Sequence, residues 1–152
     1  MHASIDSRCD SDTVFSGLEP LFCVSDYKRK SVMPEKKILI IDDEPNVCEF
    51  LSEFLLTRGF QTVSCYDGRE ALNTIQRENF DLIILDLIMP VMNGIQFLEA
   101  LQNVPIQTPI IVLSGIKDHK IAQTSMELGA LEFVPKPIDL TYLENVILMN
   151  LI

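Results

Sequence analysis

The chain has 152 residues, of which 47% are apolar, so it is long enough for one domain with a proper core and does not have a disordered composition. Its net charge of −10 comes from 12 basic and 22 acidic residues and argues against direct binding to nucleic acid, which requires clustered Lys and Arg. No apolar run approaches the roughly 20 residues of a membrane span, so we expect a cytoplasmic protein without membrane contacts.

The first part of the chain differs from the rest in composition. Residues 1–32 are rich in Ser and Asp and show no sustained period of 2 or 3.6, so we interpret them as a flexible N-terminal extension. Residues 33–152 are expected to form the folded domain. The four cysteines lack CxxC spacing, which makes a zinc site improbable, and Cys48 and Cys65 are interpreted as reduced packing residues.

Strands and helices alternate from residue 38 onward. Short, mostly apolar runs typical of buried parallel strands occupy residues 38–41, 61–65, 82–85, 110–113 and 131–134. The first helix after a strand is indicated by apolar residues spaced at i, i+3, i+4, i+7 and i+8, namely Val47, Phe50, Leu51, Phe54 and Leu55. Helix ends are expected at Gly59, Pro105 and Gly129.

Five such strand–helix units predict an α/β fold in which helices cover both faces of a parallel sheet through right-handed crossovers. In such sheets the ligand sits beyond the carboxyl ends of the strands. The polar residues of interest lie there in the sequence: Asp42 and Asp43 after the first strand, Asp86 at the end of the third, Ser114 after the fourth and Lys136 after the fifth.

These residue types suit one kind of chemistry. Carboxylates held a few ångströms apart repel one another by about 1 to 4 kcal/mol per pair. A Mg²⁺ ion relieves that repulsion and prefers one or two carboxylates together with phosphate oxygens and waters. An aspartate beside the ion can accept a phosphoryl group, while Lys136 adds a positive charge and Ser114 a hydrogen-bond donor.

Together these residues resemble the receiver domain of two-component response regulators, including single-domain chemotaxis-type ones, over about residues 37–152. The matching runs are Ile-Ile-Asp42-Asp43-Glu44, Asp86-Leu-Ile-Met-Pro-Val-Met-Asn-Gly94, Leu-Ser114-Gly115 and Lys136-Pro137. The resemblance implies a flavodoxin-like, doubly wound sheet of five strands in the order 2-1-3-4-5. It also implies phosphorylation by the phosphohistidine of a sensor histidine kinase or a phosphotransfer protein.

By the same resemblance, Asp86 is the phospho-acceptor. Mg²⁺ would be ligated by Asp43, Asp86 and the main-chain carbonyl of Ile88, and Asp42 would reach it mainly through water. Lys136 would bridge to the acyl-phosphate.

The resemblance further implies that Ser114 grips the phosphoryl group and shifts with its loop, with Phe133 as the aromatic switch residue. Ile88 and Ile116 match positions that tune loss of the phosphoryl group, and two apolar side chains there predict slow self-dephosphorylation. The chain would catalyse only its own phosphorylation and dephosphorylation, and so is not expected to be an enzyme acting on other substrates.

The expected output is a changed face formed by the fourth helix, fifth strand and fifth helix, which would bind a downstream protein target or a second copy of the chain.

Two alternatives stay open: a receiver that acts as a non-phosphorylated scaffold, and the N-terminal receiver of a longer regulator. Singly, Asp42 and Asp43 fit helix caps, Ser114 a loop hydroxyl, Lys136 a surface charge and Phe133 a core residue. Neither of two nucleotide-binding motifs, GxGxxG or GxxxxGK[ST], follows the first strand, and Ile88 stands where aspartate-nucleophile phosphatases usually carry a second Asp.

Overall fold

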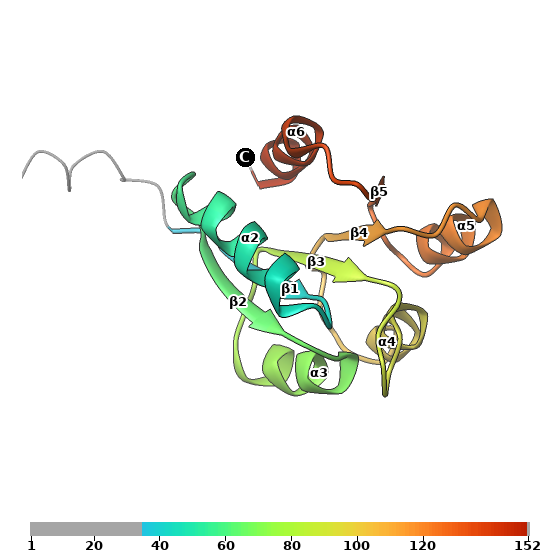
Figure 1. Cartoon of the computed structure of the whole chain (residues 1–152). Coiled ribbons are helices and arrows are strands. Elements are labelled where there is room, and N and C mark those ends of the chain that lie inside the picture. Colours follow the sequence, from blue (N-terminus) through green and yellow to red (C-terminus); the bar gives the residue numbers. More distant parts are fainter. Residues whose placement is uncertain (1–34, 152) are drawn as a thin grey trace, which may run out of the picture. The chain divides into compact units, whose positions relative to one another are not determined.

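The computed structural model describes residues 35–151, and the extension predicted for residues 1–32 lies outside them. Five strands alternate with five helices in this part of the chain (Figure 1). In chain order they are β1 (Lys37–Ile41), α2 (Pro45–Leu56), β2 (Gln61–Cys65), α3 (Gly68–Arg77), β3 (Leu82–Asp86), α4 (Gly94–Leu101), β4 (Ile110–Ser114), α5 (His119–Glu127), β5 (Glu132–Pro135) and α6 (Leu140–Leu151).

The strands form one parallel sheet in the order β2-β1-β3-β4-β5, which confirms the predicted α/β topology. Residues in β1, β3 and β4 are almost all buried because both faces of the sheet are covered. Strands buried on both faces have no polar side, which explains why these three read as continuous apolar runs.

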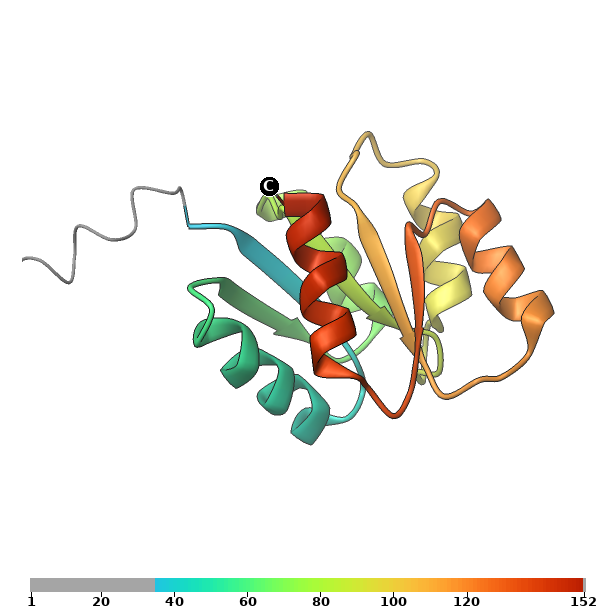
Figure 2. The ribbon, with the colours of Figure 1, turned by 90° about the horizontal axis from the view of Figure 1, so that it is seen from above.

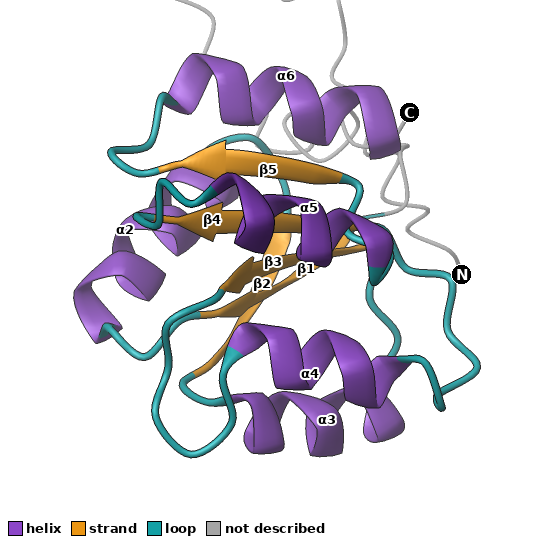
Figure 3. Ribbon diagram, turned by 90° about the vertical axis from the view of Figure 1, so that its right-hand side faces the viewer, coloured by secondary structure: helices purple, strands orange, loops and turns teal. Residues whose placement is uncertain are grey.

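Helices α2 and α6 cover one face of the sheet, where Leu51 and Leu55 pack with Leu143 and Ile147 (Figure 2). Helices α3, α4 and α5 cover the other face, where Phe97 is fully buried (Figure 3). The two apolar layers hold the strands rigidly, so the loops at the strand ends start from fixed positions.

The apolar stripe predicted for α2 was wrong at Phe50, which is 49% exposed. The helix packs through Cys48, Leu51 and Leu55, and Phe50 precedes Leu51 by one residue, which turns its side chain about 100° away on a helix of 3.6 residues per turn. Boundaries also differ slightly, since α4 ends at Leu101 rather than near Pro105.

Within residues 35–151, no helix is both long and apolar enough to cross a membrane.

The loop from β3 to α4 is closed by a tight backbone contact at Gly94. Its N–H donates to the carbonyl oxygen of Leu87 at 3.0 Å. A Cβ at position 94 would lie 2.6 Å from the carbonyl oxygen of Asp86 and 2.7 Å from the Cα of Leu87. Asn93 caps α4 with a reciprocal pair of hydrogen bonds to Gln96 at the same point. The glycine therefore lets α4 start directly against the end of β3.

We predict that Gly94→Ala lowers the free energy of unfolding by about 2 to 3 kcal/mol, because the backbone of Asp86 and Leu87 cannot move away from the added methyl group. Urea denaturation followed by circular dichroism measures the loss. Gly115→Ala is the matched control, since no atom lies within 4 Å of a Cβ built there, and it should change stability by less than about 0.5 kcal/mol. Equal effects of the two substitutions would show that the close approach at Gly94 is not what restricts this position.

Candidate functional site

The predicted site residues meet at the carboxyl end of the sheet. Because β1 and β3 are paired with Ile41 opposite Leu85, the acids that follow β1 lie beside Asp86 at the end of β3. Ser114 ends β4, where it lies opposite Pro135, and Lys136 follows immediately. From β1 the chain adds β2 on one side and β3 on the other, so the strand order reverses between β1 and β3. Ligands bind at this point in doubly wound folds.

Three carboxylates form the centre of the site. Asp42, Asp43 and Asp86 each offer an oxygen within 4.8 Å of the other two. Asp42 is 2% exposed and Asp86 is 5% exposed, whereas Asp43 is half-buried. Carboxylates that lie this close together and are buried from solvent need a positive charge between or beside them. The donor set of oxygens alone fits a hard cation such as Mg²⁺.

Lys136 supplies one positive charge to this cluster. Its Nζ lies 3.0 Å from Oδ2 of Asp42 and 3.6 Å from Oδ2 of Asp86. The other oxygen of Asp42 accepts a hydrogen bond of 2.9 Å from the N–H of Glu44. Both oxygens of Asp42 are therefore engaged by the protein itself, and Asp42 is the member of the trio that is least able to ligate an ion directly.

The proton affinities of the site reflect this crowding. The pKa of Asp86 is raised from 3.8 to about 6, mainly by burial; the charge of Lys136 opposes this rise, and the charges of Asp42 and Asp43 add to it. Burial works to lower the pKa of Lys136, but its hydrogen bond to Asp42 and the charge of Asp86 outweigh burial, so the net shift is upward. The raised pKa keeps the side chain of Lys136 as an ammonium beside the carboxylates.

Ser114 and Phe133 lie next to the acids in different surroundings. Ser114 is fully buried, and its Oγ accepts a hydrogen bond of 3.2 Å from the N–H of Ile116. The carbonyl of Ser114 also accepts the N–H of Lys136 at 2.9 Å, which ties the β4 end to the lysine. Phe133 is half-buried and lines a cavity of about 330 Å³ with Ile116 and Pro135. The Phe133 ring therefore borders open space on one side.

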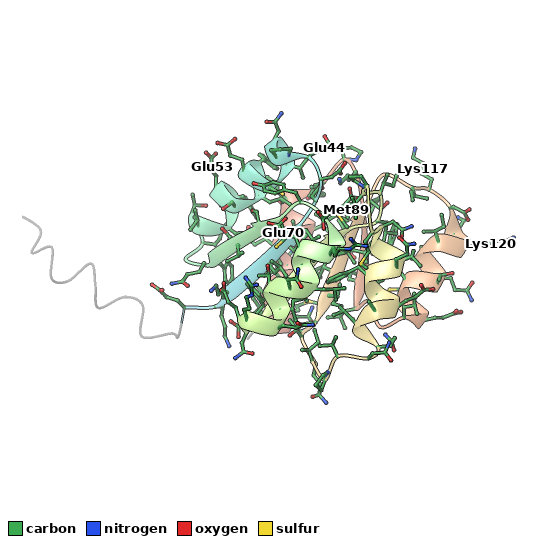
Figure 4. All side chains as sticks on the ribbon, turned by 90° about the horizontal axis from the view of Figure 1, so that it is seen from below. Glu44, Glu53, Glu70, Met89, Lys117 and Lys120 are labelled. Atoms are coloured by element: carbon green, nitrogen blue, oxygen red, sulfur yellow. The ribbon has the colours of Figure 1, made fainter. Side chains whose placement is uncertain are left out.

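Residues from the loops after β1, β3 and β4 surround the three carboxylates. Glu44, Met89 and Lys117 come from three different loops and gather at the same end of the domain (Figure 4). Ile88 is 60% exposed, and its N–H donates to Oδ1 of Asp86 at 3.3 Å, so its backbone belongs to the site while its side chain faces outward. Ile116 is half-buried against the core.

Two contacts of the site had no signal in the sequence. Cys48, interpreted as a packing residue, is buried and also donates its Sγ–H to the carbonyl oxygen of Asp42 at 3.3 Å. Burial, with a further contribution from the charge of Asp42, raises the pKa of Cys48 to about 11, so this thiol stays protonated. Gly68 is the second, since a Cβ there would lie 2.9 Å from Cγ of Met92, so α3 begins against the β3–α4 loop.

Comparison with known proteins agrees with this geometry. The family model of the response regulator receiver domain matches residues 38–148. Among curated relatives, the transcriptional regulatory protein CrdR of Helicobacter pylori is 32% identical over 111 residues, which cover 72% of this chain and 52% of CrdR. The transcriptional regulatory protein CpxR of Escherichia coli is 37% identical over 103 residues, which cover 68% of this chain and 44% of CpxR. The chain thus spans about half the length of these relatives.

Solved structures match over 95% to 100% of their own length. The chemotaxis protein CheY4 of Vibrio cholerae is 32% identical, with a TM-score of 0.71, and the match covers 78% of this chain and 100% of CheY4. The receiver domain of the Francisella response regulator 1452 is 29% identical, with a TM-score of 0.72, covering 76% of this chain and 95% of that domain.

The raised pKa of Asp86 predicts a pH-dependent stability in metal-free buffer. Because the pKa is about 6 in the folded chain against 3.8 ordinarily, the folded state binds the proton more tightly, and stability falls as pH rises from about 4 to about 6. Asp86→Asn removes the charge and should raise the free energy of unfolding at pH 8, with a ceiling of about 3 kcal/mol. At pH 5 the gain should shrink, because wild-type Asp86 is largely protonated.

Thermal unfolding of both proteins in EDTA across this pH range measures the difference. Asp81→Asn, at the opposite end of β3, is the matched control, since Asp81 accepts the N–H of Lys37 and lies outside the acid cluster. A gain from Asp86→Asn that stays constant from pH 5 to pH 8 would contradict the assigned cause. Adding millimolar Mg²⁺ should stabilise the wild type more than Asp86→Asn.

Proposed function

The chain belongs to the response regulator receiver domain family, and on this premise we propose that Asp86 accepts a phosphoryl group from the phosphohistidine of a sensor histidine kinase or phosphotransfer protein. Receiver domains serve two-component signalling, in which they interact with histidine kinases and downstream effectors. The observation that carries the proposal is the ammonium of Lys136 set between Asp42 and Asp86, in a trio of carboxylates at the strand ends.

The transfer step needs a nucleophile, an in-line donor and neutralisation of charge. A carboxylate oxygen of Asp86 attacks the phosphorus atom and forms a new O–P bond, while the P–N bond to the donor's imidazole breaks and the nitrogen keeps the electron pair. Lys136 would use another of its three N–H donors to bind a phosphoryl oxygen while it keeps its contact with Asp42. The hydroxyl of Ser114 would donate to a second phosphoryl oxygen after its loop shifts.

Asp43, Asp86 and the carbonyl of Ile88 are the groups that would hold Mg²⁺. Asp42 would act through water, because Lys136 and the N–H of Glu44 already occupy its two oxygens. The bound ion supplies positive charge that offsets the carboxylates and the incoming phosphoryl oxygens. The domain in this proposal is cytoplasmic, catalyses only its own phosphorylation and dephosphorylation, and binds no nucleic acid directly. A purely scaffolding role is disfavoured because Asp43, Asp86 and Lys136 are all in place.

Phosphorylation is proposed to change the face formed by α5, β5 and α6, with Ser114 and Phe133 as the coupling pair. The cavity beside Phe133 supports this, because it offers space into which the ring can turn when the β4–α5 loop moves. This face would bind the downstream protein or a second copy of the chain. Amide chemical shifts on this face, recorded with and without beryllofluoride as a phosphoryl mimic, test the coupling, and unchanged shifts there would refute it.

Incubation with Mg²⁺ and acetyl phosphate or phosphoramidate, followed by intact-mass analysis, tests the acceptor directly. We expect a mass gain of one phosphoryl group in the wild type and in Asp81→Asn, which makes the same change at the other end of β3. The gain should disappear in Asp86→Asn and in metal-free buffer. A folded wild type without any mass gain would shift the interpretation to the scaffold, and a gain that persists in Asp86→Asn would place the acceptor elsewhere.

Loss of the phosphoryl group is predicted to be slow, because the apolar side chains of Ile88 and Ile116 would restrict the attacking water. Ile88→Asn and Ile116→Glu should each speed dephosphorylation by about tenfold, measured from the decay of the phosphorylated mass after donor removal. Ile116 is half-buried, so circular dichroism must show that its variant is folded. A wild-type half-life of seconds that neither substitution alters would count against the proposal.

A further inference from the structure

The two edges of the sheet are protected to different degrees. Strand β5 carries Glu132, ends at Pro135 and has Val134 buried, and charges, prolines and covered residues all discourage pairing with another strand. Strand β2 at the opposite edge contains Gln61, Thr62, Val63, Ser64 and Cys65, with neither a charge nor a proline. The β2 edge is therefore the one that remains compatible with an added strand.

Hydrogen bonding defines which residues face outward from β2. The N–H of Gln61 donates to the carbonyl of Lys36 at 2.9 Å, and the carbonyl of Cys65 accepts the N–H of Asp42 at 3.1 Å. Both residues therefore direct their backbone groups at β1. Since direction alternates along a strand, the backbone groups of Thr62 and Ser64 point away from the sheet. Both residues are half-exposed, so an incoming chain can reach them.

One wall beside this edge is acidic. The hydroxyls of Ser52 and Thr62 are hydrogen-bonded, which shows which face of α2 overlooks the edge. Glu49 and Leu56 share that face with Ser52, because they lie three residues before and four residues after it, and Glu53 is the neighbour of Glu49 one turn further along the helix. All three are exposed, with Leu56 at 55%. An extended chain along β2 would therefore meet two carboxylates and an apolar side chain on its α2 side.

The other wall is closer to neutral. Cys65 lies 3.4 Å from the hydroxyl of Thr74, so the Thr74 face of α3 borders the edge. Glu70 and Arg77 lie one turn before and one turn after Thr74 on that face, and their charges offset each other. Figure 1 shows β2 between α2 and α3. A strand's side chains alternate between the two walls, so its α2-facing positions favour Lys or Arg and its α3-facing positions favour uncharged residues.

We propose that the outer edge of β2 binds an extended, basic segment of a partner protein as an added strand, with a cationic side chain at every second position. Main-chain hydrogen bonds to Thr62 and Ser64 supply affinity, and Glu49 and Glu53 supply the preference for basic segments. A second copy of this chain fits poorly, because its net charge is −10 and its own β2 edge carries the same acidic wall. This binding is independent of Asp86.

The probe is the blocked pentapeptide Val-Lys-Val-Lys-Val, titrated into the ¹⁵N-labelled full chain, with Val-Glu-Val-Glu-Val as the control peptide. The Lys peptide should shift the amide signals of Thr62 and Ser64 and slow their hydrogen exchange about tenfold. The Glu peptide should leave both unchanged. The double substitution Glu49→Lys/Glu53→Lys should weaken binding at least tenfold, whereas Glu99→Lys/Glu127→Lys, with the same change in net charge on exposed residues of α4 and α5, should not.

Ser64→Pro is the second variant, since it removes an outward N–H and leaves the β1–β2 ladder complete. It should abolish the exchange protection, with the β1–β2 amide pattern showing that the fold is kept. Binding that survives Ser64→Pro, or that weakens equally in both double charge variants, would reveal diffuse attraction and overturn the proposal. Shifts at Thr62 and Ser64 that depend on protein concentration without peptide would instead identify a second copy as the occupant and also overturn it.

Discussion

Mutual repulsion among Asp42, Asp43 and Asp86 is the constraint on which the site depends. The sheet brings their oxygens within 4.8 Å of one another, in a setting where two of the three residues are almost completely buried. Water cannot screen them well, so the protein offers the charge of Lys136 and the N–H groups of Glu44 and Ile88. Burial, and to a smaller extent the repulsion that these contacts leave uncompensated, raises the pKa of Asp86. In the proposed function, a divalent cation supplies the positive charge that Lys136 alone does not.

The rest of the fold keeps that repulsion in place. Two apolar layers clamp the central strands, so the acids cannot separate by moving the backbone. Gly94 and the capped start of α4 fix the loop that carries Ile88, and Ser114 is joined to Lys136 through the backbone. Rigid strands and tightly closed loops thus convert an unfavourable arrangement into a preformed site.

The fold and the place of the site were predictable from the sequence, because parallel strands buried on both faces appear as short, continuous apolar runs. The runs ending at Asp42 and Asp86 located the strands, and parallel topology then brought Ser114 and Lys136 to the same edge. Phe50 was misplaced because the stripe on α2 is narrower than its apolar residues suggest. The preference of Lys136 for Asp42, at 3.0 Å against 3.6 Å to Asp86, depends on sub-ångström packing that no residue pattern encodes. The approach of Gly94 to the Asp86 carbonyl is likewise a backbone distance, and a glycine in a loop does not disclose it.

That approach has a genetic consequence. In the run from Asp86 to Gly94, the last residue is restricted by a steric contact, and the first is restricted by its proposed chemistry. A collection of loss-of-function alleles should therefore contain two classes within nine codons. With Asp86 as the proposed phospho-acceptor, alleles at Asp86 are expected to leave the protein abundant but unable to signal, whereas alleles at Gly94 are expected to deplete it through degradation of poorly folded chains. Protein abundance in such alleles then distinguishes loss of signalling from loss of the folded domain.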